Sequence, residues 1–267
     1  MDSRPVWPAR FDLCNDVAES AWILPRLLDW GRTIGTPVTS LVPRGYDAYV
    51  RVLHPASAGP EGETVRWRAI AETTGRVFHP LVQFERIFDP AALEAANGSV
   101  APPRVGHLGL ATCAALYGQL AGWTTTPEDC WFGIWDGWGS FGYPRSMVFF
   151  GPGRTGQRQV EADLEALARR LETSPRFRHP DRDYFLAHGP LGAACDLVGS
   201  VVAVTPNLAW PRDRAWVVAT EIDFDSTLVA CPAACAEALL ANPALEAVRV
   251  GPRERLDLGG DVRNPER

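Results

Sequence analysis

The chain contains no lysine, because all 26 of its basic residues are arginine. Without a lysine amine there is no Schiff-base nucleophile, no lysine general base and no P-loop lysine to bind phosphates. The sequence therefore excludes pyridoxal-phosphate enzymes and P-loop NTPases. Together with the abundant Ala, Gly and Pro, the exclusive use of arginine indicates a GC-rich bacterial genome.

The sequence also lacks long hydrophobic runs. No window approaches the ~18 uninterrupted apolar residues of a membrane-spanning helix, and residues 1–17 contain no apolar core of a signal peptide. We therefore expect a cytoplasmic protein with no membrane partner. A net charge of -6 without a basic patch argues against nucleic acid as a partner. The six cysteines lack framework spacing and are expected to be buried free thiols.

Diagnostic catalytic and metal-binding motifs are missing as well. There is no Gly-x-Ser-x-Gly nucleophile elbow, and no His-x-x-x-His or Cys-x-x-Cys pair nominates a zinc site. Three of the five histidines, His54, His79 and His179, precede proline, which favours extended backbone at strand ends and turns. The motifs predict no bound metal and no cofactor.

The pattern of apolar residues predicts the fold. Strands are expected over 46–54, 64–71, 184–187, 215–224 and 245–250, and helices over 105–121, 157–171 and 232–240. Without strict alternation of strands and helices, this predicts an α+β fold with a mixed, largely antiparallel sheet packed against helices. We expect one globular α+β domain over residues 1–267. A loose similarity between 47–66 and 183–215 leaves two similar lobes, 14–150 and 151–255, as an alternative.

The most unusual stretch is Cys130–Pro144, which contains three of the ten tryptophans and four glycines. Its first six residues predict a strand buried on both faces, and Asp136-Gly137 predicts a turn into a loop rich in aromatic residues and glycine. Rings with polar tips could line a ligand pocket. The candidate ligand-binding residues are Trp135, Asp136, Trp138, Phe141 and Tyr143. The alternative interpretation is that these rings only fill the core.

An acidic alternation at Glu221, Asp223 and Asp225 gives the candidate catalytic residues. On a strand, residues two apart point to the same face, so three carboxylates would line it and could hold a divalent cation. The alternative is a solvent-facing strand edge that ends in a turn at Asp225-Ser226-Thr227.

A small basic cluster follows the helix expected over 157–171. Arg176, Arg178 and Arg182, with His179, could bind a phosphate or a carboxylate. A solvated loop explains these residues equally well.

Three segments together resemble a family of uncharacterised proteins from high-GC Gram-positive bacteria. They are 130–139, Pro206-Asn207-Leu208 with Trp210-Pro211, and the segment from Ala219 to Thr227. The resemblance covers most of the chain and implies no known activity. Small Gly and Ser residues usually follow the acidic segment in that family, whereas this chain has Ala230-Cys231-Pro232.

Two main hypotheses follow. The first is a binding or accessory protein whose pocket for a small molecule or a protein partner is formed by the Trp/Gly loop. The second is a metal-assisted hydrolase that uses Glu221, Asp223 and Asp225 with a nearby His. A cleft shared by Asp136 and the acidic residues would favour the enzyme, and an open acidic face would favour binding. A third hypothesis places Trp210 and Trp216 in a subunit interface.

Overall fold

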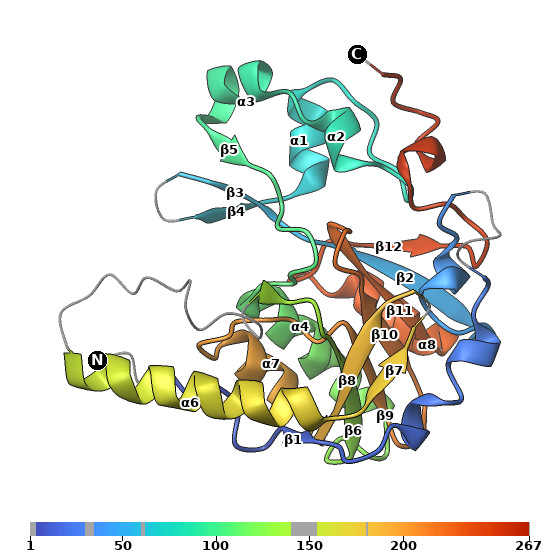
Figure 1. Ribbon diagram of the computed structural model, residues 1–267. Helices are drawn as coiled ribbons and strands as arrows, with labels where there is room; N and C mark the ends of the chain where they lie inside the picture. Colours follow the sequence, from blue (N-terminus) through green and yellow to red (C-terminus); the bar gives the residue numbers. More distant parts are fainter. Residues whose placement is uncertain (1–3, 30–34, 60–61, 140–153, 180, 267) are drawn as a thin grey trace.

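A large antiparallel sheet is the main feature of the computed structural model, which describes residues 4–29, 35–59, 62–139, 154–179 and 181–266. Within these residues nine strands join the sheet in the order β1-β8-β6-β9-β10-β11-β2-β12, with β7 added beside β8 (Figure 1). The strands are β1 (Asp12–Leu13), β2 (Ala48–Leu53), β6 (Cys130–Trp135), β7 (Arg176–Arg178), β8 (Asp183–Gly189), β9 (Leu208–Pro211), β10 (Val217–Thr220), β11 (Ser226–Cys231) and β12 (Ala247–Val250).

Alternating side chains divide this sheet between two hydrophobic layers. In β10, Val218 belongs to one cluster, whereas Val217 and Ala219 belong to the other. The same alternation places Phe185 and Tyr184 of β8 on opposite sides. Because successive residues of a strand point to opposite faces, a sheet covered on both faces needs nearly continuous apolar strands. The residues of β2 and β11 are accordingly all buried.

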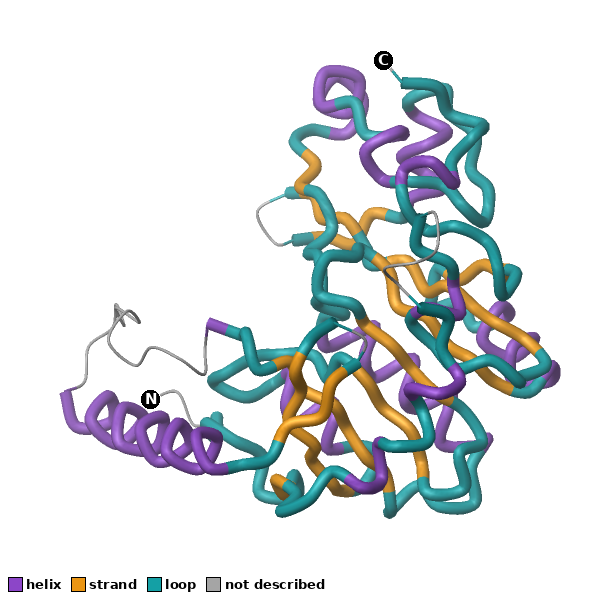
Figure 2. Tube along the Cα trace, turned by 45° about the vertical axis from the view of Figure 1, so that its right-hand side comes forward, coloured by secondary structure: helices purple, strands orange, loops and turns teal. Residues whose placement is uncertain are grey.

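Helices cover the first face of the sheet. They are α4 (Leu110–Leu120), α6 (Arg154–Thr173), α7 (Ala193–Val198) and α8 (Ala233–Ala241). Helix α6 contributes Leu164, Leu167 and Leu171 to this core, at the spacing of one helix face. The N-terminal end of α6 projects beyond the sheet (Figures 1 and 2).

The second face is covered by irregular chain rather than by long helices. Three short 3₁₀ helices, η1 (Ala18–Ser20), η2 (Leu24–Arg26) and η4 (Val38–Ser40), bring Ile23, Leu27 and Leu41 onto it. Residues 36–39 are held by backbone hydrogen bonds to residues 252–256, including one from Val38 N to Glu254 O of 3.0 Å. This loose covering leaves room for a cavity between the sheet and the η4 segment.

A smaller unit packs against the C-terminal end of strand β2, where Leu53 joins its apolar cluster. It contains a three-stranded sheet, β4-β3-β5, and three helices around a separate apolar cluster (Figure 1). The elements are β3 (Ala56–Ala58), β4 (Glu63–Val65), β5 (Val100–Ala101), α1 (Trp67–Thr73), α2 (Phe84–Ile87) and α3 (Pro90–Asn97). Two short 3₁₀ helices, η5 (Ala121–Trp123) and η6 (Leu258–Gly260), complete the fold.

The α+β class predicted from the sequence is confirmed, and so is the buried strand Cys130–Trp135. The strand predicted over 64–71 is wrong, because β4 ends at Val65 and α1 begins at Trp67. In the main sheet, β6 and β2 from the range 14–150 each lie between strands from the range 151–255. The two ranges therefore share one sheet. None of the helices in the described ranges combines the length and apolar composition needed to span a bilayer.

Candidate functional site

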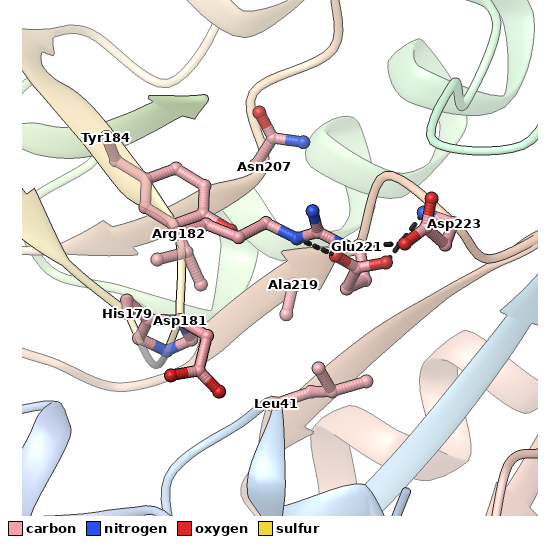
Figure 3. Close-up of a pocket in the computed structure, with 10 residues that line it drawn as sticks. Leu41, His179, Asp181, Arg182, Tyr184, Asn207, Ala219, Glu221 and Asp223 are labelled. Carbon is pink, nitrogen blue, oxygen red and sulfur yellow. Dashed lines mark hydrogen bonds and ion pairs between the residues drawn. The ribbon is translucent and has the colours of Figure 1, made fainter. Parts of the chain in front are cut away.

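A cavity of about 320 Å³ lies on the second face of the sheet, where β8, β9 and β10 meet the η4 segment (Figure 3). The η4 segment, the strands β8, β9 and β10, the turn between β7 and β8 and the turn between β10 and β11 supply its wall, which contains both apolar and charged side chains. The lining residues are Leu41, His179, Asp181, Arg182, Tyr184, Asn207, Leu208, Ala219, Glu221 and Asp223.

The apolar part of the wall follows from strand alternation. Tyr184, Leu208 and Ala219 come from β8, β9 and β10, and all three point to the second face of the sheet. Leu41 approaches from the covering segment opposite them. A ligand in this cavity would therefore rest on an apolar surface.

The charged part of the wall is organised by Arg182. Its Nε donates to Glu221 Oε1 at 2.7 Å and its Nη2 donates to Asp223 Oδ2 at 2.5 Å. The guanidinium also lies over the Trp135 ring, 5.6 Å from the ring centroid. One cation thus holds two carboxylates of the cavity wall in fixed positions.

Glu221 is the most buried of these carboxylates, with 6% of its surface exposed. Burial raises its pKa, although hydrogen bonds from Asp223 N and Arg182 and the charge of Arg182 act against that rise. Its Oε2 accepts the Asp223 backbone N–H at 2.6 Å, which closes the turn after β10. Glu221 is therefore both a turn-forming residue and a wall of the cavity.

The predicted acidic strand is wrong beyond Thr220. Strand β10 ends there, and Glu221, Asp223 and Asp225 lie in the turn that leads to β11. They do not line one strand face. Asp225 lies 3.6 Å from the buried Arg51 guanidinium and lines a different cavity of about 420 Å³. Ser226 and Thr227, expected in a turn, are buried residues of β11.

His179 is the chemically distinctive residue of the site. Only 3% of it is exposed, and its Nε2 is buried without a hydrogen-bond partner. Burial lowers the pKa of His179 to about 4, opposed by a hydrogen bond to its own backbone carbonyl. The His179 ring is therefore neutral at neutral pH, with one ring nitrogen protonated and the other able to accept a hydrogen bond.

Asn207 connects this cavity to the tryptophan-rich strand. Its Oδ1 accepts from the Trp135 backbone N–H at 2.8 Å and from Trp138 Nε1 at 3.1 Å, and its Nδ2 donates to Thr220 O at 3.0 Å. All of these groups hold the ends of β6, β9 and β10 together. Asn207 is therefore a positioning residue for the strand ends.

The candidate ligand-binding residues of the Trp/Gly stretch lie behind this wall. Of the described residues, Trp135, Asp136 and Trp138 do not line the cavity. Trp135 and Trp138 contact each other edge to face, with ring centroids 5.7 Å apart, and Asp136 forms an ion pair with Arg176 at 3.0 Å. Phe141 and Tyr143 lie outside the described residues. Asp136 and the acidic residues therefore do not share one cleft.

Two residues of the basic cluster belong to the cavity, although the sequence pattern does not place them in one site with the acidic residues. Arg182 and His179 line the cavity, whereas Arg178 pairs with Asp183 at 3.4 Å. The cluster does bind carboxylates, but they belong to the same chain. The density of Arg, His and Asp over 176–183 was the available signal, and its partners, some 40 residues away, could not be assigned from the sequence.

Gly137, Gly139 and Gly142 follow β6 with the spacing Gly-x-Gly-x-x-Gly. In dinucleotide-binding proteins this spacing connects a parallel strand to a helix within a βαβ unit. Strand β6 instead pairs antiparallel with both β8 and β9. The spacing therefore does not indicate a dinucleotide site, and at Gly137 it reflects packing, because a Cβ would lie 2.1 Å from the Trp135 ring.

Across the described part of the chain, no three His, Cys, Asp or Glu side chains are arranged to hold a metal ion. Four histidines already have partners, and one of them is His107, whose Nδ1 lies 3.3 Å from Thr205 Oγ1. His79 Nε2 bonds Asp261 at 2.7 Å, His188 Nε2 bonds Asp129 at 2.7 Å, and His54 lies between Arg104 O and Thr227 Oγ1.

Trp210 and Trp216 are buried, with 1% and 0% of their surfaces exposed. The hypothesis that places them in a subunit interface is therefore wrong.

Comparison of the chain with protein-family models, with curated proteins and with solved structures finds no match.

Proposed function

We propose that this protein binds a small molecule with hydrogen-bond donor groups and no net negative charge in the His179–Glu221 cavity. The observation that carries the proposal is the buried Nε2 of His179, a residue of the cavity wall, because this atom has no partner in the protein. We take Nε2 to be the unprotonated, accepting nitrogen of the neutral ring. Leaving a buried polar atom unsatisfied costs about 1–3 kcal/mol. A ligand N–H or O–H would remove that cost.

The charges of the cavity wall support this choice of ligand. The cavity wall contains three carboxylates, Asp181, Glu221 and Asp223, and one guanidinium, that of Arg182. Arg182 is already paired with two of them, so no free cation remains among the lining residues to bind an anionic ligand. An ammonium group can donate both to a carboxylate and to His179 Nε2, and a hydroxyl group can donate to either of them.

Size and surface also fit a metabolite rather than a macromolecule. The cavity volume of about 320 Å³ is at the lower end of ordinary small-molecule sites. Leu41, Leu208 and Ala219 would contact the apolar part of such a ligand. We therefore favour a compact amine or polyol with a short hydrocarbon portion.

The metal-assisted hydrolase has less support. Arg182 occupies the carboxylates that a cation would need, and its charge repels a cation at that position. Asp225 is directed to Arg51 in another cavity. The second hypothesis therefore lacks a set of converging ligands.

We also infer a bacterial, cytoplasmic protein. All six cysteines lie in the described part of the chain and are free thiols, as is usual in reducing compartments. The arginine-only composition supports a GC-rich bacterial source.

A thermal-shift screen tests the proposal. Ethanolamine, putrescine and glycerol represent the favoured chemistry, and acetate and phosphate represent anions. A compound at 100 times its Kd stabilises the folded state by about 2.7 kcal/mol. We expect stabilisation by an amine or polyol, lost in Ala219→Leu, which fills the cavity, and retained in Ala162→Leu on the exposed side of α6.

Nitrogen NMR of the histidine rings tests the carrying observation directly. We expect both His54 and His179 to have a protonated Nδ1 and an unprotonated Nε2 at pH 7, and only the Nε2 resonance of His179 to shift when a ligand donates to it. The assignment is made with His179→Gln. A protonated Nε2 at His179 would contradict the proposal, because the ring would then require an acceptor rather than a donor.

A further inference from the structure

Two cysteines from different helices are in contact on the helical side of the sheet. Cys113 of α4 and Cys195 of α7 are 82 residues apart in the sequence, yet their Sγ atoms are 3.5 Å apart. The two helices lie side by side on the first face of the sheet (Figure 1). A disulfide has an S–S length of about 2.05 Å, so an approach of about 1.5 Å would bring the sulfurs to bonding distance.

The two sulfurs differ in their access to solvent. Cys113 is fully buried in the core, whereas Cys195 is partly exposed. Cys195 lines a surface cleft of about 420 Å³ together with Pro8, Arg10, Leu110 and Asp196. A small oxidant in this cleft can reach Cys195 directly, and Cys113 stands behind it.

The contact also makes the two thiols chemically unequal. When Cys195 loses its proton, the S–H of Cys113 can donate to the thiolate, which lowers the pKa of Cys195, although burial and the charge of Asp196 act in the other direction. The same hydrogen bond, with burial, raises the pKa of Cys113. Arg10 pairs with Asp196 at 2.8 Å and offsets its negative charge beside Cys195. The exposed sulfur is therefore the one that favours the thiolate, which is the nucleophilic form.

The other cysteines lack this combination. Cys14 is also partly exposed, but burial and the nearby Asp16 and Asp12 raise its pKa to about 11. Cys130 is fully buried, and burial and Asp129 raise its pKa to about 12. Cys231 and Cys235 are both fully buried. Among the six cysteines described, only the Cys113–Cys195 pair combines a solvent-accessible sulfur with a second sulfur in contact with it.

We propose that Cys113 and Cys195 form a peroxide-sensitive dithiol that is oxidised reversibly to a disulfide. The Cys195 thiolate attacks one oxygen of hydrogen peroxide, the O–O bond breaks, and the departing hydroxide takes up a proton as water. Cys113 Sγ then attacks the sulfur of the Cys195 sulfenic acid. The S–S bond forms, and the sulfenic oxygen leaves as a second water with the Cys113 proton. Two thiols are oxidised and one peroxide is reduced.

The bond would fix α7 to α4 by a covalent link across 82 residues. This constrains the unfolded chain, so the oxidised protein should melt at a higher temperature than the reduced protein. The change is confined to the helical face and does not involve the His179–Glu221 cavity, so it is independent of the proposed ligand.

The test uses the purified full-length chain with hydrogen peroxide, followed by blocking of free thiols and peptide mass spectrometry. We expect a loss of 2 Da, a linked Cys113–Cys195 peptide, and reversal by dithiothreitol. Cys195 should react at least tenfold faster than Cys14, which serves as the internal control of similar exposure. Equal rates at Cys14 and Cys195, or oxidation of Cys195 to sulfinic acid without a linked peptide, would overturn the proposal.

Variants separate the two steps. Cys113→Ser should stop at the sulfenic acid of Cys195, trapped by dimedone, and Cys195→Ser should abolish the reaction at Cys113. Cys14→Ser should leave the linked peptide unchanged. If Cys113→Ser does not fold, Cys113→Ala serves in its place and should also stop at the sulfenic acid of Cys195. The linked peptide of the unmodified chain still shows that the second step takes place. A linked peptide that still forms at Cys113 in Cys195→Ser would also overturn the proposal.

Discussion

Gly106 supports the turn that carries Glu221 and Asp223. Its φ is +66°, and its N–H donates to Phe224 O at 2.8 Å. A Cβ at this position would lie 2.7 Å from Ile222 O and 2.8 Å from Ile222 Cα. Both the backbone conformation and the close approach therefore require glycine.

We predict that Gly106→Ala destabilises the protein by about 1–3 kcal/mol, because the new methyl group meets backbone that cannot move without displacing the turn. Urea unfolding measures the change. Gly118→Ala is the matched control, because Gly118 is exposed within α4 and has no neighbour within 4 Å of its Cβ position. The control should stabilise by about 0.5–1 kcal/mol. A stability loss in Gly118→Ala, or none in Gly106→Ala, would contradict this account.

At the same scale, the sequence supplied the residue types of the candidate site better than their arrangement. Glu221 and Asp223 were selected as a row of carboxylates, and they do line a cavity, but in a turn and in contact with Arg182. His179 was noted only within a basic cluster. Its burial depends on residues far from it in the sequence, so no local pattern could show that its Nε2 has no partner.

At the scale of elements, periodicity predicted those whose environment is uniform. Strand β6 lies between β8 and β9, and its continuous apolar sequence predicted its bounds correctly. Helix α6 was predicted from its leucine spacing, and the structure extends it by a few residues at each end. In both cases one period describes the whole segment.

Helix α1 was missed because its start is fixed by a distant residue. The Glu246 carboxylate accepts from Trp67 N at 2.7 Å and from Arg68 N at 2.9 Å. These N–H groups belong to the first turn of α1 and have no partner within the helix. The capping residue is 179 residues away in the sequence. The local alternation of apolar and polar residues over 65–71 also fits a strand, so it predicts a strand where the structure has a helix.

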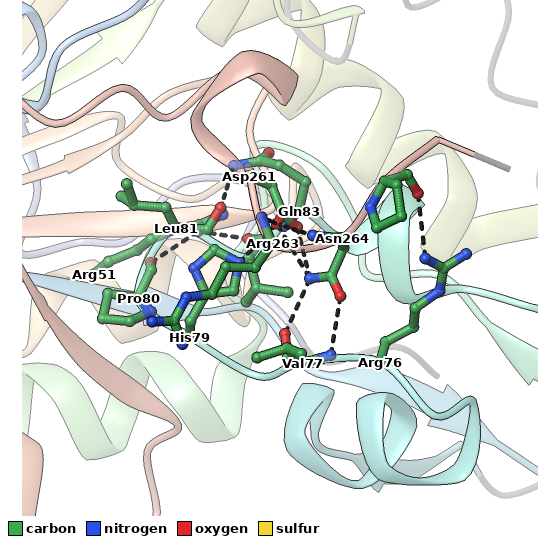
Figure 4. A network of polar contacts seen from close by, with 12 residues as sticks. Arg51, Arg76, Val77, His79, Pro80, Leu81, Gln83, Asp261, Arg263 and Asn264 are labelled. Atoms are coloured by element: carbon green, nitrogen blue, oxygen red, sulfur yellow. Dashed lines mark hydrogen bonds and ion pairs between the residues drawn. The ribbon is translucent and has the colours of Figure 1, made fainter.

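The C-terminal segment is attached to the smaller unit by one buried carboxylate (Figure 4). Asp261 accepts from His79 Nε2 at 2.7 Å, from Gln83 N at 3.0 Å and from Asn264 Nδ2 at 3.0 Å. Burial alone would raise the pKa of Asp261, but these hydrogen bonds outweigh it and lower that pKa. The stabilisation is therefore present above the ordinary carboxyl pKa and is lost as pH falls below it.

We predict that Asp261→Ala destabilises the protein by about 3 kcal/mol at pH 7, because His79 Nε2, Gln83 N and both the backbone and side-chain N–H groups of Asn264 lose their acceptor. Hydrogen exchange should also accelerate at residues 77–83, which the segment covers. Glu266→Ala is the control from the same segment, since the Glu266 side chain is 84% exposed and pairs only at the surface with Arg86. Its effect should stay below about 0.5 kcal/mol. Similar losses in both variants would show that Asp261 is not the anchor.

For the whole molecule, buried neutral histidines control stability in weak acid. Burial lowers the pKa of His54, His107 and His179 to about 4 in the folded state, whereas an unfolded histidine has a pKa of about 6.5. Between these values the unfolded chain binds more protons than the folded chain. The free energy of unfolding must therefore fall as pH decreases from about 6.5 to about 4. Glu221, Asp225 and Glu246, whose pKa values burial raises, act in the opposite direction.

We predict that stability falls by about 2 kcal/mol each for His54 and His179 between pH 7 and pH 5. Urea unfolding at the two pH values measures the sum over all titrating groups, and the difference between the unmodified chain and His179→Gln gives the contribution of His179, because glutamine does not titrate. The variant should lose about half of the pH dependence that the two residues cause. The same variant replaces His179 Nε2 at the proposed ligand site by an amide, which has two donors beside its one acceptor oxygen. A smaller pH dependence together with a lost ligand response would therefore connect the buried neutral ring to both properties, whereas an unchanged pH dependence would show that His179 is not held neutral by burial.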